Sequence, residues 1–132
     1  MSNDLEGQGW ARLGVAAAIG REYASDARAF LPFLSRLLEG AMPDETTVKT
    51  QGFFKKTIVG VNVDLGGTRY SLDDPGRGPL AAARTQVVRG IALKTEAIPM
   101  DVLLAELEAA LEARARENAD ARKALAGILG LG

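Results

Sequence analysis

Strict alternation of apolar and polar residues marks the middle of the chain. From residue 59 to residue 65, every second position is a large aliphatic residue (Val59, Val61, Val63 and Leu65). A period of two is typical of a strand with one buried face. Gly66-Gly67 follows directly, and a glycine pair after such a run favours a tight hairpin turn. The pattern therefore predicts a β-hairpin whose returning strand covers residues 68–72.

Further strands flank this hairpin. Residues 46–54 are predicted to form a strand that ends in a turn near Lys55-Lys56. Residues 73–79 are rich in Asp, Pro and Gly and predict a loop. Residues 80–96 predict one long strand, or two strands broken at Gly90, because glycine inside a strand often marks a bulge. No connection is long enough for a helical crossover, so residues 46–96 are expected to form a four-stranded antiparallel meander.

Helical spacing replaces this alternation before residue 41. Residues 10–40 are predicted to be helical in two pieces, and in the second piece apolar residues recur at intervals of three and four (Phe30, Leu31, Leu34, Leu37 and Leu38). Pro32 forfeits one helical hydrogen bond, so the helix either kinks there or restarts with Pro32 in its first turn. Gly40 followed by Pro43 indicates a C-terminal stop.

The last helix is predicted over residues 99–129, with Pro99 at its first position. Its apolar stripe runs through the first half and returns near the end (Met100, Leu103, Leu104, Leu107, Leu111, Leu125, Ile128 and Leu129). A straight helix rises about 1.5 Å per residue, so this one would overhang a nine-residue strand that rises about 3.3 Å per residue. The expected fold is α+β: a four-stranded antiparallel meander with an N-terminal helix and a long C-terminal helix on one face.

Composition narrows the possible functions. The 132 residues suit one domain, expected to cover residues 10–132 after a flexible stretch at residues 1–9. The chain contains no cysteine and no histidine. These absences exclude disulfides, thiol nucleophiles, thiolate metal sites and the Ser-His-Asp triad. We therefore expect a protein that is not an enzyme and that has no cofactor.

The net charge of −1 conceals a basic middle segment. Residues 46–98 carry four acidic and eight basic residues, whereas both flanking segments are acidic. If the alternating valines face the helices, the outer sheet face is expected to carry Asp64 and four basic residues (Lys49, Arg69, Arg84 and Lys94). The positions of Arg84 and Lys94 depend on Val87, Ile91 and Leu93 pointing inward, with a bulge near Gly90 relieving a buried Arg89.

Such a basic face has two interpretations. It could bind an anionic ligand, nucleic acid or an acidic partner. It could equally be the solvated face that antiparallel sheets ordinarily have. Nucleic acid is disfavoured, because Phe53 or Phe54 is the one aromatic candidate near the patch and sheet-face binders of single strands normally add stacking platforms.

Two other constellations have simpler explanations. Asp73 and Asp74 could hold a divalent metal in an enzyme, but adjacent acids before Pro75-Gly76 more simply form a turn. The Gly66-Gly67 and Gly76-Arg77-Gly78 turns could cradle a phosphate. A phosphate loop leads into a helix N-terminus, however, and both turns lead into strands. We predict no metal site.

The C-terminal helix favours self-association. Its acidic residues come early and its basic residues late, which suits the helix dipole and would also suit antiparallel pairing of two copies. The overhanging end needs a partner for its apolar residues (Leu125, Ile128 and Leu129). Trp10 could pack on the domain or on a second copy. A membrane-surface role for Trp10 is disfavoured, because Arg12 and Arg21 are the only basic residues near it.

These patterns predict a non-enzymatic, self-associating interaction or adaptor module that forms a homodimer and binds a protein partner. The alternative is a binding protein for an anionic ligand or nucleic acid. Asp4 and Glu6 stand where a signal peptide would carry basic residues, and residues 10–20 are too short to span a bilayer. We expect a cytoplasmic protein without a membrane span, and the bias toward Ala, Gly, Leu and Arg is typical of a GC-rich bacterial genome.

Overall fold

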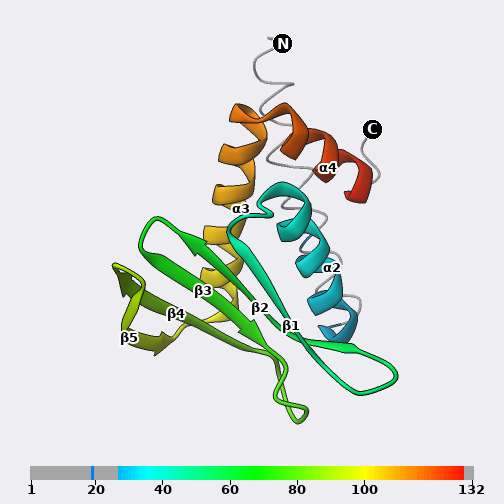
Figure 1. The fold of residues 1–132 in the computed structure, drawn as a ribbon, viewed down its shortest axis with the longest axis vertical. Helices are drawn as coiled ribbons and strands as arrows, with labels where there is room; N and C mark the ends of the chain where they lie inside the picture. The colour runs from blue at the N-terminus through cyan, green and yellow to red at the C-terminus, as the bar shows by residue number, and fades with distance from the viewer. Residues whose placement is uncertain (1–18, 20–26, 130–132) are drawn as a thin grey trace.

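A computed structural model describes Ile19 and residues 27–129 (Figure 1). The elements in chain order are α2 (Ala27–Ala41), β1 (Thr46–Gln51), β2 (Thr57–Leu65), β3 (Thr68–Asp73), β4 (Ala81–Val88), β5 (Ile91–Ala97), α3 (Met100–Glu117) and α4 (Ala119–Leu129). The strands form one antiparallel sheet in the order β1-β2-β3-β4-β5. The predicted α+β class and the meander are confirmed. The flexible stretch and most of the first helical piece lie outside the described residues, apart from Ile19, which is helical and fully buried.

The sheet has five strands rather than the predicted four. Residues 80–96 contain both β4 and β5, so the predicted alternative of a break at Gly90 is the observed one. Arg89 has φ 52° and Gly90 has φ 81°. Two consecutive residues with positive φ form the tight turn that suits the twist of a hairpin. The register also shifts between Gln86 and Val87, which places the bulge beside this turn rather than in it.

The pairing register assigns every sheet residue to one of two faces. Opposite residues of an antiparallel pair share a face. Val61 pairs with Leu72, and Leu72 pairs with Ala82. All three are buried and lie on the face that the helices cover. We call this the helix-side face and the opposite one the open face.

The two long apolar stripes form the core on the helix-side face. α2 contacts β1 and β2, and α3 contacts β4 and α2. The stripe of α3 is buried at Leu103, Leu107 and Leu111, and α2 contributes most of the remaining large side chains (Phe30, Leu31, Leu34, Leu37 and Leu38). Pro32 lies inside α2, which continues through it. One hydrophobic cluster joins the helices and the sheet.

The predicted single C-terminal helix is wrong, because it breaks at Asn118. Asn118 has φ −133° and ψ 113°, which is extended backbone. Its Oδ1 accepts a hydrogen bond from the backbone N–H of Ala121 at 3.0 Å, so it caps the start of α4. α4 then turns back across α2 (Figure 1). The last turns of α3 and the whole of α4 lie beyond the end of the strands, but α4 packs against α2, so this end does not stand free (Figure 1).

Candidate functional site

The register separates the four basic residues that were expected on one outer face. Lys49 pairs with Gly60, and Arg69 pairs with Asp64 and Thr85, all on the open face. Arg84 pairs with Tyr70 instead, and Tyr70 pairs with Val63 of the core. Arg84 therefore lies on the helix-side face.

Lys94 lies on that same helix-side face, since it pairs with Gln86, two residues from Arg84. The expectation of one shared basic face is therefore wrong. It took Val87 and Leu93 as inward, but the bulge between Gln86 and Val87 changes the phase of the hairpin end.

The open-face bases are bound to carboxylates. Arg69 Nε lies 2.7 Å from Asp64 Oδ1, and this hydrogen bond and charge raise the pKa of Arg69. Lys49 forms an ion pair with Asp73, although their strands are separated by β2. Gly60 lies between them, and a β-carbon there would collide with both side chains. The missing side chain of Gly60 is what lets Lys49 meet Asp73.

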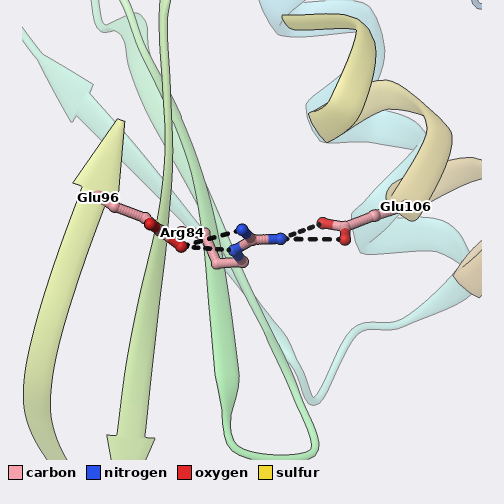
Figure 2. A network of polar contacts seen from close by, with 3 residues as sticks. All are labelled: Arg84, Glu96 and Glu106. Carbon is pink, nitrogen blue, oxygen red and sulfur yellow. Dashed lines mark hydrogen bonds and ion pairs between the residues drawn. The ribbon is translucent and has the colours of Figure 1, made fainter. Parts of the chain in front are cut away.

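Arg84 joins the sheet to α3 through two carboxylates (Figure 2). Its Nη2 lies 2.9 Å from Glu96 Oε1 on β5, and its Nη1 lies 3.1 Å from Glu106 Oε1 on α3. The pKa of Arg84 is raised chiefly by the hydrogen bond to Glu96. Burial and a hydrogen bond with Glu106 raise the pKa of Tyr70 beside it. The guanidinium of Arg84 is thus bound by two carboxylates, and it positions Glu96 on the edge strand.

Lys94 is different, because it forms no ion pair within the part of the chain that the structure describes. Its side chain is exposed on β5. It lines an open hollow of about 250 Å³ together with polar residues of β3, β4 and β5 (Thr68, Arg84, Gln86 and Glu96). Lys94, the basic residue without a carboxylate partner, therefore lies two residues from Glu96 on the same face of β5.

β5 is an exposed edge. All seven of its residues are exposed, including Ile91 at 64% and Leu93 at 61%. The N–H of Ile98 donates to the carbonyl of Ala82 at 3.0 Å. Because bonded pairs alternate along an antiparallel ladder, residues 94 and 96 also turn their backbone groups toward β4. Thr95 and Ala97 therefore turn theirs toward the free edge.

The expected self-association residues of the C-terminal helix lie inside the chain or against it. Leu125 is fully buried, and Ile128 and Leu129 are half-buried against the core. These residues belong to α4, which packs against α2. The expectation that the end of the last helix has no partner within the chain is therefore wrong. Trp10 lies outside the described residues.

Two loops, β1–β2 and β3–β4, lie at the end of the sheet that is opposite the β4–β5 turn. Phe53 and Phe54, between β1 and β2, are 94% and 101% exposed. In the β3–β4 loop, Asp74 Oδ1 accepts a hydrogen bond from the N–H of Gly76 at 2.8 Å, which is turn chemistry. Among the residues that the structure describes, no group of three acidic side chains could hold a metal ion.

The sequence reading identified Lys94 but missed Glu96 and Thr95. The available signal was the order Lys-Thr-Glu, in which alternation puts opposite charges on one strand face. Nothing in the sequence indicated that Glu106 would meet Arg84.

Comparison of the chain with protein-family models, with curated proteins and with solved structures finds no match. Within the described part of the chain, no helix has both the length and the apolar character needed to cross a membrane.

Proposed function

We propose that this chain is a non-enzymatic interaction module that pairs with a second copy of itself through β5. One observation carries the proposal: the exposed edge strand bears Lys94 and Glu96 on one face, on either side of Thr95. Such an arrangement is complementary to itself in the antiparallel sense. An unpaired edge is also a template for strand addition.

The pairing follows from a two-fold axis at Thr95. Thr95 of one copy lies opposite Thr95 of the other, and both turn their backbone groups to the free edge, so they exchange two hydrogen bonds. Lys94 then faces Glu96 of the second copy, and Glu96 faces its Lys94. These are the non-bonded positions of the ladder, where opposite side chains approach most closely. Lys94 thereby gains a carboxylate partner, and Glu96 gains a second cation beside Arg84.

The expected affinity is modest. A cross-strand pair contributes roughly 0.2–1 kcal/mol. A single pair of short strands buries less than the roughly 1,200 Å² of a stable interface. We therefore expect a dimer whose population rises with concentration. The alternative, an anionic-ligand site, has less support, because Lys49, Arg69 and Arg84 are already paired with carboxylates.

The first test removes one hydrogen-bond donor from the free edge. Thr95→Pro deletes an N–H that faces away from β4, so the β4–β5 ladder keeps its bonds. The matched control is Thr95→Val, since both variants lose the hydroxyl that lies 2.9 Å from Thr85 Oγ1. Sedimentation equilibrium should show a dimer for the control and a monomer for Thr95→Pro. A strict monomer for the wild-type chain at high concentration would overturn the proposal.

The second test uses the charges. Lys94→Glu puts like charges opposite each other twice in a homodimer, and so does Glu96→Lys. Each variant alone should be monomeric, whereas an equal mixture restores both opposite-charge pairs and should give a heterodimer. Equal dimerisation of the wild type and both variants, with no gain on mixing, would assign the contact to another surface.

A further inference from the structure

The tip between β1 and β2 exposes two aromatic rings that nothing in the fold requires. Phe53 and Phe54 are almost completely accessible, and their ring centroids lie 6.0 Å apart. Three other large apolar side chains of the described chain are exposed (Val88, Ile91 and Leu93), but none of these is aromatic. Exposed aromatic pairs of this kind mark contact surfaces.

The backbone gives this tip a defined shape. Gly52 has φ +119°, a conformation that other residues rarely adopt. A β-carbon there would collide with the carbonyl oxygen of Lys55, so the chain turns back tightly at this point. Phe53 and Phe54 follow Gly52 in this turn, and both are exposed, as are Lys55 and Lys56 after them.

The charge around the tip is positive. Lys55 and Lys56 lie in the same loop, and Arg77 lies in the β3–β4 loop at the same end of the sheet (Figure 1). None of these three bases is in an ion pair within the described chain. Of the nearby acids, Asp73 is neutralised by Lys49, and Asp74, which accepts from the N–H of Gly76, leaves one negative charge against three positive ones. The end of the sheet therefore combines apolar rings with unpaired cations.

We propose that this tip docks on the surface of an anionic phospholipid bilayer. The two rings enter the boundary between headgroups and acyl chains, and the three cations approach the phosphates. The rings carry no hydrogen-bonding group and suit the apolar side of this boundary, while the cations suit its charged side. A single-stranded nucleic acid suits the tip less well, because such ligands are held in a basic groove with stacking platforms.

Vesicle co-sedimentation tests the proposal. The wild-type chain should bind vesicles of phosphatidylserine and phosphatidylcholine, and binding should weaken with salt and fall sharply on phosphatidylcholine alone. Phe53→Ser/Phe54→Ser should weaken binding by about tenfold or more, and Lys55→Gln/Lys56→Gln by a similar factor. Both variants should keep the wild-type circular dichroism spectrum, because all four side chains are exposed.

A matched control distinguishes the tip from general stickiness. Val88→Ser removes an exposed apolar side chain at the end of β4, outside both the tip and β5, and should leave vesicle binding unchanged. The proposal would be overturned if this control lost as much vesicle binding as the phenylalanine variant. It would also be overturned if the wild-type chain bound neutral and anionic vesicles equally well. Binding to a single-stranded oligonucleotide by the same four residues, without binding to vesicles, would overturn it as well.

Discussion

Gly40 offers the sharpest test of how α4 is held against α2. It lies near the end of α2, and a β-carbon added there would sit 3.1 Å from Ile128 Cδ1 and 3.3 Å from Ala124 Cβ. Its φ is not in the left-handed region, so a substitution meets only a problem of space. The predicted C-terminal stop is thus a helical residue whose small size admits the neighbouring helix.

The size of the effect follows from these two distances. Replacing a glycine inside a helix by alanine ordinarily raises the free energy of unfolding by about 0.5–1 kcal/mol. At Gly40 part of this gain is lost, because both neighbours must move by a few tenths of an ångström. Gly127 of α4 provides the control, since a β-carbon there meets nothing within 4 Å. We expect Gly127→Ala to stabilise by roughly 0.5–1 kcal/mol and Gly40→Ala by clearly less.

A side chain larger than alanine at position 40 should lower the free energy of unfolding instead of raising it. Gly40→Leu must push α4 away and should cost about 1–3 kcal/mol, as overpacking does. Ile128→Ala removes the atom nearest to the new side chain. The double variant Gly40→Leu/Ile128→Ala should therefore recover at least about 1 kcal/mol relative to the sum of the single effects.

Urea unfolding followed by circular dichroism at pH 7 measures all five variants. The slope should stay constant, so that midpoints report stability directly. Additivity of Gly40→Leu and Ile128→Ala within about 0.5 kcal/mol would refute the reasoning, because it would mean that the two positions do not touch. Equal gains from Gly40→Ala and Gly127→Ala would refute it as well.

Three other substitutions test the core, the sheet and a half-buried carboxylate. Leu107→Ala empties a fully buried site on α3 and should cost about 2–5 kcal/mol of unfolding free energy in urea. Gly60→Ala should stay within about 1 kcal/mol of wild type, because the new carbon displaces only flexible side-chain ends while the strand gains rigidity. Burial and the charge of Glu112 raise the pKa of Glu108, so its ionised form opposes folding. Glu108→Gln should therefore be more stable than wild type at pH 7, and the difference should vanish as the pH falls below the ordinary glutamate pKa of about 4.3.

Local patterns predicted the parts of the fold that local chemistry determines. The alternation at residues 59–65 became β2, and Gly66-Gly67 became its turn, with φ 56° and 90°. A buried strand face needs only a period of two, and a two-residue hairpin needs only positive φ. Adjacent residues meet both requirements, so the local sequence was enough to predict them.

The phase of β4 could not be read in this way. Its sequence, AAARTQVV, has little contrast between the two faces. The bulge after Gln86 then changes the phase where the apolar residues begin. The register places Arg84 on the helix-side face, where its guanidinium meets Glu106 of α3, 22 residues away along the chain. The break at Asn118 likewise depends on a cap and on the space at Gly40, which belong to different helices.

In the proposed dimer the charges of β5 not only attract each other but also specify one register. Pairing centred on Thr95 matches Lys94 with Glu96, whereas a shift of one strand by two residues puts Lys94 opposite Lys94 or Glu96 opposite Glu96. A shift by one residue brings the two faces into conflict. An edge lysine ordinarily discourages strand addition. In the proposed dimer, Glu96 offsets the charge of Lys94, so one partner strand can add in one register.

That alignment makes a prediction which a cysteine can check, because the chain has none of its own. In the proposed pair the Cα atoms of Thr95 in the two copies are about 5.5 Å apart, a distance that a disulfide spans. Thr95→Cys should therefore form a covalent dimer under mild oxidation. In Ala97→Cys the two thiols would be four residues apart along the strands, roughly 13 Å, and should not join. Cross-linking of Ala97→Cys in preference to Thr95→Cys would show that the strands pair in another register and that the charges do not choose it.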